Sequence, residues 1–246
     1  MKGNEEREKV ITIAVCDDEK YVLDRLEKDC RNYFEEKGLT VQMFLSVSGE
    51  ELLKMCRGKE ISLALLDIEM PEMSGFELAD YLRLCAHMER LVFITNKEDL
   101  VYESMNYQPF GFVRKSRWEE ELSRTINRFY NELVRNEARI TVRLRKKETM
   151  ELLVCEIHYI EIIGHTLSIY RKDSIIKIRE TMRSMEERLK EHYFIRIHQG
   201  YLVNARYIWK FEKNDCILVD GKRLPISRYK KNAVRKQYMD YIRKCG

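Results

Sequence analysis

The sequence lacks the features that would place the protein in a membrane or outside the cell. No apolar run approaches the roughly 20 residues that a membrane-spanning helix needs, and the charged start at residues 1–9 has no signal-peptide core. Seven cysteines are present, but none forms a Cys-x-x-Cys pair, so neither a zinc site nor a disulfide framework is indicated. We therefore expect a cytoplasmic protein that makes no contact with a membrane.

Acidic and basic residues are divided unevenly along the chain, whose 246 residues suffice for two domains. Residues 1–135 hold 20 Lys and Arg against 27 Asp and Glu, a net charge of −7. Residues 136–246 hold 25 against 14, a net charge of +11. The basic half favours a polyanionic partner such as nucleic acid, and a solvated basic surface is the alternative reading.

The first half alternates apolar runs with amphipathic stretches. The runs predict strands over 10–16, 40–45, 61–67, 90–95 and 110–114, and the stretches predict helices over 19–37, 49–57, 74–86, 98–106 and 117–134. Gly38 fits the end of the first helix, while Ser48 and Ser74 fit capping boxes because a glutamate follows each three residues later. Five strand–helix repeats predict an α/β domain with a five-stranded, doubly wound parallel sheet.

From about residue 136 the pattern changes to short alternating runs with polar joints, which is typical of antiparallel strands. The expected strands are 140–144, 149–154, 157–163, 166–170, 174–178, 194–196, 207–213, 215–219 and 222–226. One helix is expected near 181–190, with Met182, Met185 and Leu189 on one face, and a basic helix over about 229–244. These changes set the expected domains at 8–130 and 139–246. The connection, 131–138, contains neither Pro nor Gly and predicts a short helical continuation.

Carboxylates follow two of the predicted strands at the point where each strand ends. The run 61–66 ends on Asp67, and the run 10–16 ends on Asp17 and Asp18. Such a run predicts a strand buried on both faces of a parallel sheet, and open sheets of this kind bind ligands at the carboxyl ends of their strands. Three carboxylates at one edge require a cation, and hard carboxylate oxygens favour Mg²⁺.

Two further polar residues end predicted strands, Thr95 after the fourth and Lys115 after the fifth. In type, order and position these residues resemble the receiver domain of bacterial response regulators, over about residues 8–130. The resemblance implies a flavodoxin-like fold in which Asp67 is the phosphoacceptor and forms an acyl phosphate. It also implies a Mg²⁺ site in which Asp18 and Asp67 bind directly, Asp17 mostly through water, and Glu69 through its backbone carbonyl.

The same resemblance implies which residues respond to phosphorylation and act as the switch. Lys115 would pair with one phosphoryl oxygen, Thr95 would bond another, and Phe112 would then turn inward. Ser116 departs from the proline usual after the lysine. Because a non-proline cis bond costs about 3 kcal/mol, we expect a trans bond and a slightly different angle of approach for the lysine. Taken singly, Asp17 and Asp18 could merely start a helix, Thr95 could be another cap, and Lys115 could be a surface lysine.

The basic half has its own signature in residues 193–208, Tyr-Phe-Ile-Arg-Ile-His-Gln-Gly-Tyr-Leu-Val-Asn-Ala-Arg-Tyr-Ile. Together with the run 225–229 after Gly221, and the run 159–161 before Gly164, it resembles the LytTR DNA-binding domain over about residues 138–244. The resemblance implies a mostly-β fold of ten strands, whose loops enter the major groove and read bases through His165, Gln199 and Arg228. Candidate phosphate contacts are Lys210, Lys213, Lys222, Arg223, Lys230 and Lys231.

Simpler readings exist for these residues too. His165 could be a turn residue, Arg228 could cap the last helix, and the basic run 230–236 could be a solvated helix face. His198 is expected to be structural, and 201–203 to belong to the core.

Together the two resemblances imply a two-component response regulator. A sensor histidine kinase would phosphorylate Asp67, and phosphorylation would favour a homodimer that binds double-stranded DNA and regulates transcription. We expect that it is not an enzyme and shows only slow self-phosphorylation from small phosphodonors and slow self-dephosphorylation. One alternative is a Mg²⁺-dependent phosphohydrolase, although Glu69 stands where such enzymes carry a second Asp. The other is a protein-binding regulator with no role at DNA.

Overall fold

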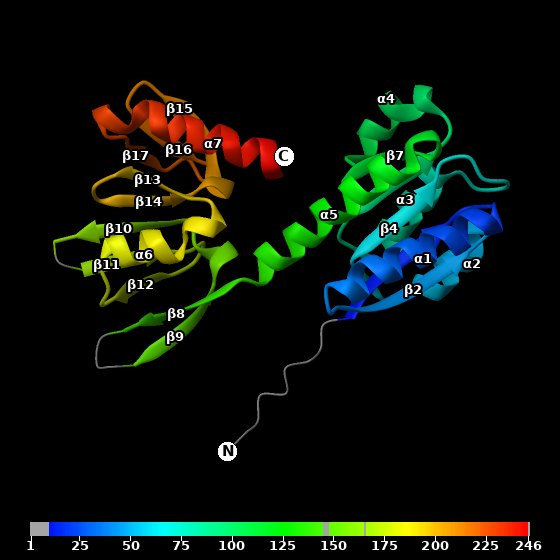
Figure 1. The fold of residues 1–246 in the computed structure, drawn as a ribbon, viewed down its shortest axis with the longest axis horizontal. Helices are drawn as coiled ribbons and strands as arrows, with labels where there is room; N and C mark the ends of the chain where they lie inside the picture. The colour runs from blue at the N-terminus through cyan, green and yellow to red at the C-terminus, as the bar shows by residue number, and fades with distance from the viewer. Residues whose placement is uncertain (1–9, 145–147, 165, 246) are drawn as a thin grey trace, which may run out of the picture. The chain divides into compact units, whose positions relative to one another are not determined.

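The computed structural model describes residues 10–144, 148–164 and 166–245, and the chain divides into two compact units, Met1–Asn127 and Arg128–Gly246 (Figure 1). Among the described cysteines, those at positions 16, 30, 56 and 216 are buried and free. Within the described residues, no helix combines the length and the apolar character that crossing a membrane requires.

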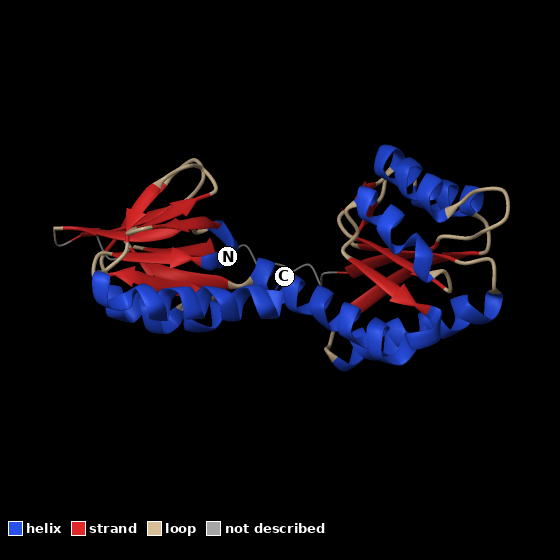
Figure 2. Ribbon diagram, turned by 90° about the horizontal axis from the view of Figure 1, so that it is seen from above, coloured by secondary structure: helices blue, strands red, loops and turns tan. Residues whose placement is uncertain are grey.

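The first unit is built on a five-stranded parallel sheet in the order β2-β1-β4-β6-β7. The strands are β1 (Val10–Cys16), β2 (Thr40–Ser46), β4 (Leu63–Asp67), β6 (Leu91–Thr95) and β7 (Gly111–Arg114). Every residue of the inner strands β4 and β6 is buried, and Figure 2 shows helices on both faces of the sheet. The doubly wound α/β fold predicted from the alternating pattern is confirmed.

The helices of this unit are α1 (Lys20–Glu36), α2 (Gly49–Cys56), α3 (Gly75–Cys85), the short α4 (Val101–Ser104) and α5 (Trp118–Glu137). Helix α5 extends to Glu137, which confirms the helical continuation predicted for the connection, and its residues are shared between the two units.

Three details of the first unit differ from the sequence prediction. The predicted strand 61–67 is interrupted at Ser62, which leaves a short β3 (Glu60–Ile61) paired with a further short strand, β5 (His87–Met88). The predicted helix 98–106 has only one α-turn, between the 3-10 turns Glu98–Leu100 and Met105–Tyr107. There the Ser104 hydroxyl donates to the Val101 carbonyl oxygen at 2.7 Å, a bond that competes with regular helical bonding.

The helix-end signals were partly right. Gly38 has a φ of 71° and donates its N–H to the Glu35 carbonyl, as expected after a helix end. Ser74 forms a complete capping box with Glu77 on α3. The capping box predicted at Ser48 is wrong, because Ser48 makes no side-chain cap bond and Glu51 instead lies 2.9 Å from the hydroxyl of Ser46.

The second unit is mostly β, as predicted, and its described part holds ten strands in three sheets. A five-stranded antiparallel sheet has the order β12-β11-β10-β14-β13, a three-stranded sheet the order β15-β16-β17, and β8 pairs with β9. The strands are β8 (Arg139–Arg143), β9 (Thr149–Leu153), β10 (Tyr159–Ile163), β11 (Thr166–Tyr170), β12 (Ile175–Ile178), β13 (Phe194–His198), β14 (Tyr201–Asn204), β15 (Ile208–Glu212), β16 (Asp215–Leu218) and β17 (Arg223–Pro225).

Two helices complete this unit, α6 (Met182–Arg188) and α7 (Lys231–Cys245). Met182, Met185 and Leu189 are buried in one core cluster, as their spacing predicts. A second cluster lies beneath α7, which contributes the buried Val234. Strand β14 was missed by the sequence prediction, which had placed 201–203 in the core without a strand. Its four residues are too few, and three of them too uniformly buried, for an alternating pattern to show.

Candidate functional site

The acidic residues of the first unit meet at the carboxyl edge of its sheet. Strands β1 and β4 are adjacent and parallel, with Cys16 opposite Leu66, so the next residues, Asp17 and Asp67, lie at the same edge. Asp17 is 1% exposed and Asp67 5%. Each of Asp17, Asp18 and Asp67 offers a carboxylate oxygen, and these atoms all lie within 4.8 Å of one another. The cluster predicted from the strand ends is therefore present.

Lys115 reaches into this cluster from the turn after β7. Its Nζ lies 2.6 Å from Oδ2 of Asp67 and 2.8 Å from Oδ2 of Asp17, and it also lies 3.2 Å from Oε1 of Glu19. Burial by itself would lower the pKa of Lys115, but its hydrogen bonds to the two aspartates outweigh burial and raise the pKa. The lysine therefore stays charged and partly neutralises the cluster. The contact with Glu19 was not predicted.

Burial raises the pKa of both buried aspartates, Asp17 and Asp67. It raises the pKa of Asp17 to about 6, although hydrogen bonds from Lys115 and from the Glu19 N–H act in the opposite direction. Burial likewise raises the pKa of Asp67, against hydrogen bonds from Lys115 and from the Glu69 N–H. One lysine beside these carboxylates leaves negative charge that a cation would balance.

The two predicted switch residues lie on the neighbouring strands. Thr95 ends β6, is 1% exposed, and accepts the Lys97 N–H through its hydroxyl oxygen at 3.2 Å. Phe112 on β7 is half-buried and packs against the core cluster of this unit.

An ion pair that the sequence did not reveal joins the two loops beside the cluster. Nζ of Lys97, in the loop after β6, lies 3.0 Å from Oε1 of Glu69, in the loop after β4. The Glu69 side chain therefore pairs with Lys97, and the metal-binding role predicted for Glu69 concerns its backbone carbonyl.

Gly75 allows the start of α3 to lie directly against the end of β4. A Cβ atom at this position would come 2.0 Å from the backbone oxygen of Asp67, which is far closer than any real contact. The Gly75 N–H donates to the Ile68 carbonyl oxygen at 2.9 Å, which ties the helix start to the same loop. No other residue could occupy this position without displacing Asp67.

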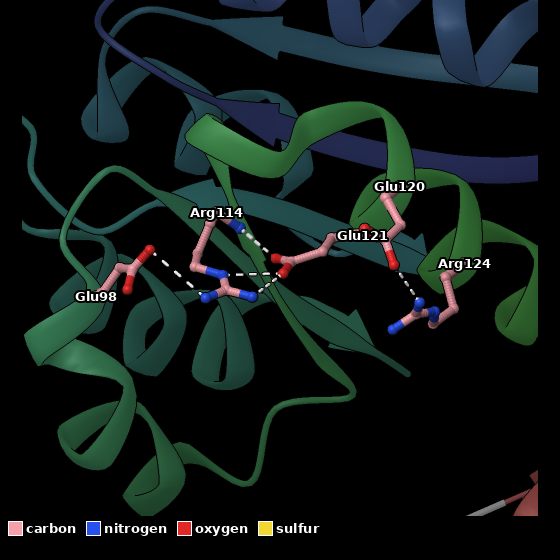
Figure 3. A network of polar contacts seen from close by, with 5 residues as sticks. All are labelled: Glu98, Arg114, Glu120, Glu121 and Arg124. Carbon is pink, nitrogen blue, oxygen red and sulfur yellow. Dashed lines mark hydrogen bonds and ion pairs between the residues drawn. The ribbon is translucent and has the colours of Figure 1, made fainter.

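A polar network fixes the strand end from which Lys115 projects (Figure 3). Arg114, the last residue of β7, donates its backbone N–H and its Nε–H to the Glu121 carboxylate, both at 2.9 Å, and its Nη2 contacts the same group. Its Nη1 lies 3.5 Å from Oε1 of Glu98, in the segment after β6. The second pair in Figure 3, Glu120–Arg124, is exposed and lies on α5 alone.

The departure at Ser116 does not keep Lys115 from the site. None of the peptide bonds in the described part of the chain is cis, which confirms the trans bond expected at this position. Arg114 and Glu121 anchor the strand end before Lys115 and the helix that follows it.

In the second unit, backbone bonds bring together the segments predicted to read bases. The Ile162 N–H, at the end of β10, donates to the Gly200 carbonyl oxygen at 3.0 Å, and the Ser227 N–H donates to the Ile197 carbonyl oxygen at 2.9 Å. The residues next to these bonds, Gln199 and Arg228, are both exposed. In Figure 1 the β13–β14 turn and the start of α7 lie at the same edge of this unit. His165 lies outside the described residues.

His198 has an internal role, as predicted. Its Nδ1 accepts the Gly200 N–H at 3.2 Å, which uses the ring to hold the turn. In the strand that follows, the Tyr201 hydroxyl donates to Glu161 on β10 at 2.6 Å. This bond connects the strands on which two of the predicted reading segments are carried.

The candidate phosphate contacts fall into two groups. Lys210 pairs with Glu212 at 2.7 Å, Arg223 pairs with Glu212 and Asp215, and Lys231 donates to Asn214 at 2.5 Å. The second group makes no ion pair with any residue that the structure describes, and its members are Lys213, Lys222 and Lys230. The charges of these three lysines, and that of Lys231, whose partner Asn214 is a neutral amide, are not offset by a neighbouring carboxylate among the described residues.

Two family models match the chain, the response regulator receiver domain over residues 13–127 and the LytTr DNA-binding domain over residues 147–239. The chain is 22% identical over 238 residues to the transcriptional regulatory protein NatR of Bacillus subtilis, covering 95% of this chain and 98% of that protein. It is 20% identical over 239 residues to the sensory transduction protein LytT of Bacillus cereus, covering 89% and 95%. A crystal structure of a response regulator receiver domain protein from Clostridium thermocellum is 25% identical, with a TM-score of 0.39, and covers 50% of this chain and 96% of that one.

Proposed function

The chain is a two-component response regulator that joins a receiver domain to a LytTR DNA-binding domain, and from this premise we propose that phosphorylation of Asp67 controls its binding to double-stranded DNA. The observation that carries the proposal is the contact of Asp67 with Lys115 at 2.6 Å, inside a cluster of three aspartates at a sheet edge. A carboxylate held beside a fixed cation is suited to attack a phosphoryl group. The lysine can then form ion pairs with the phosphoryl oxygens.

The donor set at this edge fits Mg²⁺. It consists of carboxylate oxygens within 4.8 Å of one another, with one exposed member, Asp18, at the rim. Hard oxygen ligands of this kind suit Mg²⁺, which neutralises carboxylate and phosphoryl charge when it is bound. Asp17, Asp18, Asp67 and the backbone carbonyl of Glu69 would hold it.

In the proposed reaction a carboxylate oxygen of Asp67 forms a bond to phosphorus while the bond from phosphorus to a histidine nitrogen of a sensor kinase breaks. Lys115 then pairs with a phosphoryl oxygen, and the Thr95 hydroxyl leaves the Lys97 N–H to bond another. Phe112, which is half-buried, turns inward as the β6 loop moves. We expect the protein alone to show only slow self-phosphorylation and self-dephosphorylation.

The proposed output is DNA binding by the second unit. Gln199 and Arg228 are exposed on segments joined by backbone bonds, so they can reach neighbouring bases in one groove. His165 is proposed for the same role from the sequence alone. Phosphorylation is proposed to favour a homodimer, because two linked DNA-binding domains gain affinity through effective concentration. We propose that the receiver domain spans residues 8–130, that the DNA-binding domain spans 139–246, and that 131–138 connects them.

Asp67→Asn tests the proposal in the full-length protein with Mg²⁺ and a small acyl phosphate donor. The wild type should gain a phosphoryl group by mass spectrometry, shift toward a dimer in sedimentation, and bind a duplex selected from a random pool more tightly. The variant should do none of these. Asp80→Asn, an exposed carboxylate change on α3, is the matched control and should behave as the wild type. A donor response that survives Asp67→Asn would refute the proposal.

A further inference from the structure

The turn between β13 and β14 carries Gln199, and an arginine to which the sequence assigned no role holds that turn. We propose that Arg196 is a positioning residue for DNA recognition, which fixes the turn from within the protein and makes no contact with DNA phosphates. The inference rests on the proposed function of the second unit as the part that binds DNA.

The guanidinium of Arg196 contacts both backbone carbonyls at the turn. Its Nε–H donates to the His198 carbonyl oxygen at 3.1 Å, and Nη2 donates to the Gln199 carbonyl oxygen at 2.8 Å. Nη1 lies 2.6 Å from Oε2 of Glu186 on α6. The Arg196 side chain is 20% exposed and that of Glu186 is 42% exposed, so the three contacts are partly shielded from water.

Only arginine can make this set of bonds. Its donors lie in one rigid plane, so a single side chain can address two successive carbonyls and a carboxylate at once. A lysine would keep the charge but would lose the fork, because its ammonium is a single point of attachment. The Glu186 carboxylate balances the charge, which leaves little of it for a phosphate.

The remaining backbone groups of the turn are fixed by other partners. His198 accepts the Gly200 N–H through Nδ1 at 3.2 Å, and the Gly200 carbonyl oxygen accepts the Ile162 N–H at 3.0 Å. Three successive residues of the turn therefore have a held backbone, while the Gln199 side chain is exposed. A reading side chain on a fixed backbone loses less conformational freedom on binding, which favours the correct base contact over others.

Arg196→Lys in the full-length protein is the first test, with a duplex selected by the wild type and a scrambled duplex as probes. We expect roughly tenfold weaker binding of the selected duplex, because a misplaced bidentate contact loses discrimination of that order. Binding of the scrambled duplex and the slope of log affinity against log salt should be unchanged. Arg139→Lys alters an ion pair of the same unit, with Glu151 at 3.2 Å, and should affect neither probe.

A phosphate contact would give a different pattern and would overturn the inference. The variant would then lose affinity for both duplexes equally, and its salt slope would fall by about one unit. Unchanged affinity for the selected duplex would overturn it too.

Glu186→Gln separates the two roles even if Arg196→Lys does not fold. If Arg196 positions the turn, loss of its partner carboxylate weakens binding of the selected duplex. If Arg196 instead serves as a phosphate contact, loss of the competing carboxylate tightens binding of both duplexes and the inference fails.

A wild type that binds no duplex refutes the proposed function. Hydrogen exchange at the Gly200 amide still tests the positioning, since exchange should be faster in both variants.

Discussion

Burial of Asp17 opposes the ionisation of its carboxyl group. Its side chain is buried, and burial raises its pKa to about 6 against the pull of Lys115. An acid whose pKa is higher in the folded than in the unfolded protein binds its proton more tightly in the fold. Its contribution to stability is therefore present at low pH and lost as the pH rises through the folded pKa.

We predict that Asp17→Asn removes this pH dependence in the metal-free protein. Between about pH 4 and pH 6, the free energy of unfolding of the wild type should fall relative to that of the variant by on the order of 2 kcal/mol. Only the wild type has to ionise a buried carboxylate over this range. Urea denaturation of both proteins across these pH values measures the difference. Parallel pH profiles would show that the burial of Asp17 carries no such cost.

At the scale of elements, the beginnings of α2 and α3 have the same sequence signal and different structures. Ser74 accepts the Glu77 N–H and its own N–H donates back to the Glu77 side chain, whereas Ser48 makes no such bond. A serine and a glutamate at the right spacing are therefore not sufficient when another hydroxyl, here that of Ser46, competes for the glutamate.

We predict that Ser74→Ala destabilises the receiver unit by about 1 kcal/mol, because it removes an N-cap bond. Ser48→Ala is the matched control and should cost measurably less, since no cap bond is lost. Urea denaturation followed by circular dichroism compares the two variants. Equal losses would mean that the capping box at α3 adds nothing to stability.

The junction between β7 and α5 gives a second prediction at this scale. Glu121→Gln should lower the stability of the receiver unit and slow its phosphorylation from a small donor, because Arg114 would lose the charge that fixes the strand end next to Lys115. Glu120→Gln, on the same helix turn, breaks only the exposed pair with Arg124 and should change neither quantity. Donor-dependent phosphorylation rates and thermal unfolding of both variants provide the measurements.

Elements with a local signal could be predicted from the sequence, and elements that depend on distant partners could not. The strand end at Asp67 and the glycine after α1 each have a local physical cause, and both were placed correctly, although the strand itself is interrupted at Ser62. The rule that ligand sites form at the carboxyl edge of parallel sheets correctly predicted that Asp17, Asp67 and Lys115 lie at one edge.

The Lys97–Glu69 pair and the fork of Arg196 depend on the paths of loops, which no periodicity determines. Strand β14 shows the same limit, because it is defined by its pairing with β10 and β13.

At the scale of the whole molecule, the separation of charge along the sequence coincides with the division into two domains. The half with a net charge of −7 holds the receiver domain with its cluster of three aspartates, and the half with +11 holds the LytTR DNA-binding domain. Much of the positive charge is nonetheless paired within the protein, as at Lys210 and Arg223. The net charge therefore overstates what is available to DNA.

We predict that DNA affinity falls steeply with salt and that single lysines contribute unequally to this dependence. Lys222→Ala should lower the slope of log affinity against log salt by about one unit, because this lysine has no carboxylate partner among the described residues. Lys210→Ala should leave the slope nearly unchanged, since Glu212 already lies 2.7 Å from its Nζ. Fluorescence anisotropy titrations over a range of salt concentrations measure both slopes. A larger change for Lys210 would contradict the assignment.

The held turn at 198–200 also bears on how such a regulator can acquire new targets. Its backbone is fixed by the side chains of Arg196 and His198, and the side chain at position 199 makes no internal hydrogen bond in the described structure. If Gln199 reads bases as proposed, a single codon change there would alter the preferred operator without refolding the turn. Promoter choice would then evolve separately from maintenance of the fold, and regulons would diverge after gene duplication through exchanges at one exposed position.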